Sequence, residues 1–355
     1  MNTISILEEK IKKAAESLPA ATIMEVCGTH THAIRRYGIR QLLPEQIRLV
    51  SGPGCPVCVT AEEDISLALA AAKQPGVTLF CFGDMLRVPS GDTSLSTLQA
   101  GGADVRICVS PLDALHFALS HPAREVVWYG VGFETTTPHT AALLEAASRQ
   151  NVKNLSILCI HKTMPNALRA LLGGQTCVDA LLCPGHVAAV TGAEAFRFLP
   201  QEMGLPAAIA GFEPEELLLA LLALITMLAR GEQQLINAYP RAVKSEGNMA
   251  ARALVETWFV PSGALWRGLG WIPSSGLALR PKWAQWDAQK RFSLEPKTTS
   301  APSGCRCGDV LRGLLDPPDC ALFGARCTPE NPLGACMVSS EGACAAYYQY
   351  EGDAR

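Results

Sequence analysis

Short apolar segments alternate with amphipathic stretches over the first two thirds of the chain, and this pattern limits the possible folds more than any other feature. Each apolar segment is four to six residues long and β-rich, and most are followed by a stretch with helical spacing. Strands that alternate with helices in this way form parallel sheets covered by helices on both faces. The sequence therefore predicts an α/β fold. The predicted strands are 21–26, 47–50, 77–82, 104–109, 125–129, 155–160, 178–183 and 207–210.

The alternation starts again after residue 150 and fades after residue 238, which suggests three domains. We expect two tandem parallel-sheet α/β domains, 1–150 and 151–238, around a central cleft, and a C-terminal iron–sulfur domain, 239–355. In open parallel sheets, ligands bind beyond the carboxyl ends of the strands. Several polar or thiol side chains follow predicted strands and could meet in one cleft. They are Cys27, Cys55, Cys58, Asp84, Glu134, His161 and His186.

The composition limits the classes of partner and indicates the cellular compartment. The 355 residues carry a formal net charge of −3, without the basic surface that nucleic-acid binding requires. The longest apolar run, 217–229, is shorter than the roughly 18 residues of a membrane span, so we expect a buried helix. Residues 1–10 do not resemble a secretory signal, and 14 cysteines without export indicate reduced thiols. We therefore expect a cytoplasmic protein without nucleic-acid or membrane partners.

The stretch Cys27-Gly28-Thr29-His30-Thr31-His32 places one thiol and two imidazoles directly after a predicted strand. Thiolate and imidazole together suit zinc, copper or iron, so the stretch is a candidate metal site. The alternative is one exposed histidine with two packed side chains.

A second thiol motif, Gly52-Pro53-Gly54-Cys55-Pro56-Val57-Cys58, follows the strand 47–50. It precedes Thr60-Ala61-Glu62-Glu63, which reads as a capping box that opens a helix. A helix N-terminus favours the thiolate, so Cys55 and Cys58 are candidates for a redox or metal-binding pair. The alternative is two buried cysteines in a Pro/Gly turn.

Six cysteines lie between residues 305 and 344, in a segment rich in Gly and Pro and poor in long apolar runs. Such a segment is usually organised by a metal. Cys307, Cys320, Cys327 and Cys344 are too widely spaced for a zinc ribbon, and four thiolates from a turn-rich segment fit an iron–sulfur cluster better. Cys305 and Cys336 are additional candidates for ligands.

Seven distinctive stretches occur along the chain: 27–34, 52–58, 82–84, 132–136, 184–187, 210–214 and 337–347. Together these stretches resemble the HypD family of [NiFe]-hydrogenase maturation proteins. They occur in the family's order from about residue 24 to 350, so the resemblance covers nearly the whole chain. Where the family motif has glycine or another small residue, this chain has Thr29.

The resemblance implies a maturation scaffold with redox activity rather than a conventional enzyme. On it, an iron atom would acquire cyanide and carbon monoxide, as an Fe(CN)2CO unit, before transfer to the hydrogenase large subunit through HypC. The partner HypC would share the iron, and the cyanide donor HypE would dock on the complex. The implied site residues are Cys27 as iron ligand, His30 as its neighbour, the redox pair Cys55 and Cys58, and Glu341. The C-terminal cysteines would hold a [4Fe–4S] cluster. Because Cys307 and Cys344 lie in stretches that resemble the family's motifs, we expect the ligands to be Cys307, Cys320, Cys327 and Cys344. Cys305 and Cys336 would then be ordinary thiols.

Two other classes of function also fit parts of the sequence. An iron–sulfur thiol–disulfide oxidoreductase would use Cys55, Cys58 and a cluster, but would leave the Cys27 motif without a role. A small-molecule-binding α/β protein could hold a purely structural metal.

Overall fold

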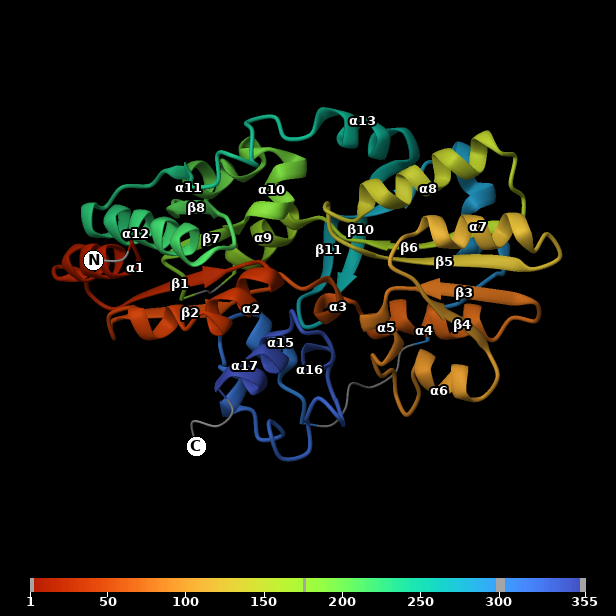
Figure 1. Ribbon diagram of the computed structural model, residues 1–355, viewed down its shortest axis with the longest axis horizontal. Coiled ribbons are helices and arrows are strands. Elements are labelled where there is room, and N and C mark those ends of the chain that lie inside the picture. Colours follow the sequence, from red (N-terminus) through yellow and green to blue (C-terminus); the bar gives the residue numbers. More distant parts are fainter. Residues whose placement is uncertain (1–2, 175–176, 298–303, 352–355) are drawn as a thin grey trace.

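The computed structural model describes residues 3–174, 177–297 and 304–351, and in it two parallel sheets lie side by side (Figure 1). The first sheet has five strands in the order β2-β1-β7-β8-β9, and the second has four in the order β4-β3-β5-β6. The α/β class is therefore confirmed. The strands of the first sheet, in spatial order, are β2 (Ile47–Ser51), β1 (Ala21–Glu25), β7 (Ala180–Pro184), β8 (Ala207–Ala210) and β9 (Leu235–Asn237). Those of the second are β4 (Asp104–Ile107), β3 (Val77–Cys81), β5 (Glu125–Gly132) and β6 (Leu155–His161).

The expected tandem arrangement of the sheets is wrong. β1 pairs with both β2 and β7, so the chain begins in the five-stranded sheet, leaves it for the four-stranded sheet and returns. β6, which the sequence assigned to a second unit, pairs with β5 across the expected boundary near residue 150. Hydrophobic periodicity identifies strands but not their partners, because each of these buried strands can pair equally well with several neighbours. How the chain divides into domains, and the central cleft, remain predictions.

Helices cover both sheets. α12 is the longest, and it packs on α1 and β8 through leucines that are fully buried. Its N-terminus has a capping box made by Glu213 and Glu216, and it ends at Gly231 in the left-handed region. The helices are α1 (Thr3–Ala15), α2 (Gly28–Arg36), α3 (Pro56–Val59), α4 (Glu62–Ala72), α5 (Gly83–Leu86), α6 (Leu95–Ala100), α7 (Leu112–Ser120), α8 (Thr137–Arg149), α9 (Met164–Leu172), α10 (Gly185–Thr191), α11 (Phe198–Glu202), α12 (Pro214–Arg230), α13 (Met249–Trp258), α14 (Ala288–Arg291), α15 (Cys307–Leu311), α16 (Ala335–Val338) and α17 (Ala343–Glu351). Short 3-10 turns span Ile39–Leu42, Ala193–Phe196, Pro281–Trp286 and Pro317–Asp319.

The capping box expected at Thr60 is absent. Thr60 donates its hydroxyl to the carbonyl of Pro56 at 2.8 Å, which closes α3, and α4 begins two residues later without a side-chain cap. The thiol pair thus has a short helix of its own, with Cys55 as the N-cap residue.

An antiparallel hairpin, β10 (Phe259–Trp266) and β11 (Gly270–Leu279), lies beyond residue 238, where the sequence analysis predicted neither of its strands. Its prolines, serines and glycines obscured the strand pattern, and a shift in register interrupts the pairing after Ser262. β11 contacts both β6 and α9, so the hairpin lies between the two sheets (Figure 1).

The C-terminal segment folds back on the beginning of the chain. α17 packs on α2, where Arg35 forms an ion pair with Glu351 at 2.6 Å and the Tyr350 hydroxyl hydrogen-bonds to Nε2 of His32 at 2.9 Å. α16 packs on α3 in the same region. The cysteine-rich segment therefore lies against both N-terminal thiol motifs.

Candidate functional site

Cys27 occupies the N-cap position of α2, two residues after β1 ends, as the sequence predicted for a strand end. Only 7% of the residue is exposed, and its backbone N–H donates to Oε2 of Glu25 at 3.1 Å. Burial raises the pKa of the Cys27 thiol to about 12, so the thiol keeps its proton in the absence of a cation. Such a thiol becomes a thiolate when a metal binds and displaces the proton.

The residue that fixes Cys27 was not singled out from the sequence. Glu25 is buried at the end of β1, and it accepts hydrogen bonds from the Cys27 N–H and from the hydroxyl of Thr31 at 2.5 Å. Burial raises its pKa to about 7. The available signal was a carboxylate in an apolar strand, two residues before a candidate ligand.

His30 lies on the first turn of α2 and is fully buried. Its Nε2 is 2.9 Å from the carbonyl of Gly211, and its ring lies 4.7 Å from the Phe212 ring, which in turn stacks on His186 at 3.8 Å. Burial lowers the pKa of His30 to about 4, so the imidazole is neutral at physiological pH. Its Nδ1 has no hydrogen-bond partner within residues 3–174, 177–297 and 304–351.

The loop before α17 covers the Cys27 motif. Thr29 donates its hydroxyl to Oε1 of Glu341 at 2.8 Å, and a Cβ on Gly28 would lie 2.5 Å from that of Glu341. The Ser339 hydroxyl donates to Oδ2 of Asp84 at 2.6 Å, so the segment that follows β3 also contacts this loop. Burial raises the pKa of Glu341. The structure thus brings Glu341 and Asp84 to the Cys27 motif.

Two other predicted strand-end residues make contacts elsewhere. His161 hydrogen-bonds through Nε2 to the hydroxyl of Thr140 at 2.9 Å, on α8. Glu134 accepts a hydrogen bond from the N–H of Met164 at 2.9 Å, at the start of α9. The expectation that all strand-end residues meet at one point is therefore not supported for this pair, whose hydrogen bonds are made within the region of α8 and α9.

The second thiol motif lies beside Cys27. Cys55 and Cys58 form a disulfide, with Cα atoms 5.3 Å apart, and both residues are buried. The Gly28 N–H donates to the Gly54 carbonyl at 2.9 Å, and a Cβ on Gly54 would lie 2.2 Å from the backbone nitrogen of Cys27. Only a glycine permits this approach of the two backbones.

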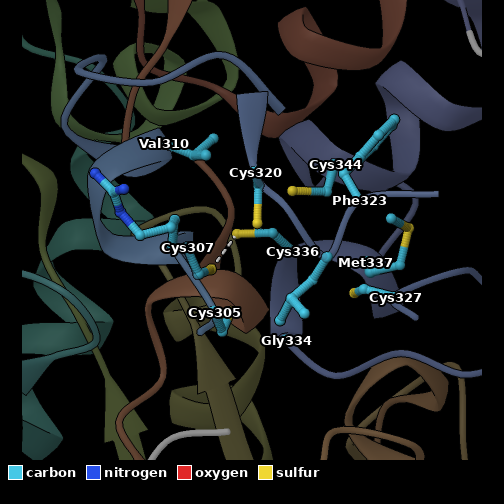
Figure 2. Close-up of a pocket in the computed structure, with 12 residues that line it drawn as sticks. Cys305, Cys307, Val310, Cys320, Phe323, Cys327, Gly334, Cys336, Met337 and Cys344 are labelled. Carbon is cyan, nitrogen blue, oxygen red and sulfur yellow. Dashed lines mark hydrogen bonds between the residues drawn. The ribbon is translucent and has the colours of Figure 1, made fainter. Parts of the chain in front are cut away.

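All six C-terminal cysteines line one pocket (Figure 2). We call these residues the cysteine pocket: Cys305, Cys307, Cys320, Cys327, Cys336 and Cys344. Figure 2 shows them on several separate segments around a shared space, with Phe323 and Met337 as apolar neighbours. The sulfur atoms of Cys307 and Cys336 are 2.7 Å apart. Hydrogen bonds from Cys305 and Cys336 lower the pKa of Cys307 well below its usual range.

The donor set of the cysteine pocket fits an iron–sulfur cluster. Thiolates drawn from several segments with an apolar lining are what such a cluster requires, and one thiol already favours the ionised form. Cys305 and Cys336, expected to be ordinary thiols, line the same pocket, so the choice of four ligands remains a prediction. Across the residues described, no three Cys, His, Asp or Glu side chains are arranged to hold a single metal ion.

The disulfide lies next to α16, the helix that contains Cys336 of the cysteine pocket. The Cys58 sulfur lies 4.0 Å from the carbonyl of Ala335, the residue before Cys336. Cys27, the disulfide and the cysteine pocket therefore follow one another in space. In the described part of the chain, no helix is long and apolar enough to cross a membrane.

Comparison with known proteins gives a consistent family. The family model HypD, described as hydrogenase formation hypA family, matches residues 2–351. The hydrogenase expression/formation protein HupD of Azotobacter chroococcum mcd 1 is 48% identical over 347 residues, which are 95% of this chain and 92% of that protein. The hydrogenase maturation factor HypD of Azotobacter vinelandii is 46% identical, over 97% and 93% of the two chains. The hydrogenase maturation factor HypD of Escherichia coli K12 is 44% identical, over 92% and 88%.

Proposed function

Because this chain belongs to the HypD family, we propose that it is a hydrogenase maturation scaffold on which the Fe(CN)2CO unit of a [NiFe]-hydrogenase is assembled and held. The observation that carries the proposal is the spatial order of three thiol groups: Cys27, the Cys55–Cys58 disulfide and the cysteine pocket. A plain metal-storage protein would not need a redox-active pair between its metal ligand and the proposed cluster.

Cys27 is the proposed ligand of the substrate iron. Low-spin iron that carries π-acceptor ligands is soft, and it prefers a thiolate. The hydrogen bond from the Cys27 N–H to Glu25 fixes the ligand at the strand end, and a neutral His30 held by Gly211 adds no positive charge beside the incoming cation. Glu341, tied to Thr29, closes the other side and keeps the site shielded from water.

A [4Fe–4S] cluster, when bound in the cysteine pocket, supplies single electrons. We propose Cys307, Cys320, Cys327 and Cys344 as its ligands. Cys55 and Cys58 exchange two electrons and two protons as they change between disulfide and dithiol. Their position between Cys27 and the pocket supports a role in electron supply during assembly of the iron unit.

The proposed partners are HypC, which shares the iron and passes it to the hydrogenase large subunit, and HypE, which donates cyanide. A cytoplasmic location is part of the same proposal. An iron–sulfur thiol–disulfide oxidoreductase is the second candidate, because the disulfide lies next to the cysteine pocket. That alternative leaves unexplained the buried contacts of Glu25 and Glu341 with the Cys27 motif.

Infrared spectroscopy separates the two candidates. The chain is purified anaerobically after co-expression with HypC and HypE, and again after expression without them. The scaffold predicts bands of iron-bound cyanide and carbon monoxide only in the co-expressed sample. A sample with full iron and sulfide content, a reducible disulfide and no such bands would contradict the scaffold and favour the oxidoreductase.

A further inference from the structure

The turn of the β10–β11 hairpin contains an arginine and lies between α3 and the cysteine pocket. Arg267 is the first turn residue, and its side chain is only 10% exposed. Its backbone N–H donates to the Val59 carbonyl and its Nε to the Thr60 carbonyl, both at 2.9 Å. These bonds attach the turn to the C-terminal end of α3, the helix that contains Cys58.

The other side of the turn lies against the pocket. Gly268 contacts Gly308 so closely that a Cβ on Gly268 would be 2.4 Å from the Gly308 Cα. Gly308 directly follows Cys307, a proposed cluster ligand. Because neither glycine has a side chain, the hairpin turn and the first turn of α15 are in backbone contact, and Arg267 lies one residue from that contact.

The Arg267 guanidinium is incompletely paired. Its Nη1 donates to Oε1 of Glu62 at 2.6 Å, whereas its Nη2 is buried with no hydrogen-bond partner among the described residues. A buried arginine N–H group without a partner is costly, so its retention calls for an explanation. The backbone contact of Gly268 with Gly308 places the Arg267 turn next to Cys307.

We propose that Arg267 sets the reduction potential of the cluster in the cysteine pocket, with Glu62 as an opposing charge. This inference rests on the proposed cluster. Reduction of the cluster adds one electron and therefore one negative charge to the pocket, and a nearby buried cation stabilises that state. Arg267 raises the potential, and Glu62, which partly neutralises it, lowers the potential. Arg267 is a positioning residue in this account, since it ligates nothing.

The test is a reductive titration of the full-length protein with dithionite, followed by the electron paramagnetic resonance signal of the reduced cluster. At the potential that reduces half of the wild-type cluster, Arg267→Gln should lower the ratio of reduced to oxidised cluster about tenfold, which is about 59 mV for a one-electron couple. Glu62→Gln should raise the ratio. Arg267→Lys, which retains the charge, should stay within about twofold of the wild type.

Arg306 offers a matched control. Arg306 lines the cysteine pocket and directly precedes Cys307, but its side chain is 56% exposed and paired with Asp309, so water screens its charge. Arg306→Gln should leave the ratio within about twofold of the wild type. A merely structural role for Arg267 would not give shifts of opposite sign for the two partners of one ion pair.

Four outcomes decide the proposal. A fully loaded Arg267→Gln protein with the wild-type ratio would overturn it, and so would shifts of the same sign in Arg267→Gln and Glu62→Gln. If Arg267→Gln does not retain iron and sulfide, Glu62→Gln carries the test, and an unchanged or lowered ratio there overturns the proposal. If the wild-type chain itself binds no iron and sulfide, the proposed cofactor fails, and this inference fails with it.

Discussion

Replacing Gly54 by alanine should force the two N-terminal thiol motifs apart. The new Cβ would lie 2.2 Å from the Cys27 nitrogen, and 2.4 Å from both the Cys27 Cα and the Val26 carbonyl carbon. Ordinary contact begins at 3.4 Å, so one backbone segment would have to move by about 1 Å. All three nearest atoms are backbone atoms at the end of β1, so a side-chain rotation cannot relieve the clash.

The cost can be estimated from two losses. Overpacking of a well-packed site costs about 1–3 kcal/mol. Separation of the segments also breaks the hydrogen bond from the Gly28 N–H to the Gly54 carbonyl, worth about 0.5–1.5 kcal/mol. Alanine also restricts the backbone of the unfolded chain, and this effect alone would raise the free energy of unfolding by about 0.4–1 kcal/mol. We expect Gly54→Ala to lower the free energy of unfolding by about 1–4 kcal/mol.

Urea unfolding, with the midpoint and slope compared between variants, measures this effect. Gly101→Ala is the control, because a Cβ there would lie no closer than 3.4 Å to its nearest neighbour and the residue only ends α6. That variant should match the wild type or be slightly more stable. If Gly54→Ala unfolds at the same urea concentration as the wild type, the backbone contact between Gly54 and Cys27 would be refuted.

Three further predictions concern protons and thiols. Burial raises the pKa of Glu134 from 4.5 to about 7, so the folded protein retains a proton that the unfolded chain releases, and stability should fall as pH rises through this window. Glu134→Gln should therefore gain about 1–3 kcal/mol over the wild type at pH 8 and nothing at pH 4, as urea midpoints at both pH values would show. Cys55 and Cys58 should change between disulfide and dithiol, and mass spectrometry after thiol trapping at a series of potentials would contradict this if one state persisted throughout. Single Cys→Ala changes across the cysteine pocket, scored by iron and sulfide content, should abolish the cluster at the four proposed ligands, and retention at Cys307 or Cys344 with loss at Cys305 or Cys336 would reverse the assignment.

The sequence predicted the strands better than their arrangement. The eight predicted strands correspond to β1–β8 within a few residues, because short apolar runs with flanking Gly and Pro are local signals. The assembly of β1 with β7 depends on contacts between residues far apart in the chain, for which the local pattern carries no information. The hairpin of β10 and β11 was missed because its strands contain serine, proline and glycine, which are typical of turns rather than strands.

Within the candidate site, the sequence identified residues by their chemistry but not by their neighbours. Cys27, the disulfide pair and the cysteine pocket were visible as thiol motifs, and Glu341 was supplied by the family resemblance. Glu25 was overlooked because an acidic residue in a strand reads as an exposed position, whereas here it is buried beneath Thr31. Arg267 carried no signal at all, since its role depends on a turn that meets Gly308.

The central claim is that Cys27 binds the iron that acquires cyanide and carbon monoxide, and Cys27→Ala tests it most directly. Cys108→Ala is the matched control, because both residues are free cysteines that are 7% exposed, and Cys108 lies at the end of β4 on the other sheet. Both variants are co-expressed with HypC and HypE, and their infrared spectra and cluster absorbance are recorded. We expect Cys27→Ala to lose the cyanide and carbonyl bands while it retains the cluster absorbance, and Cys108→Ala to keep both. Bands of wild-type intensity in Cys27→Ala would contradict the account.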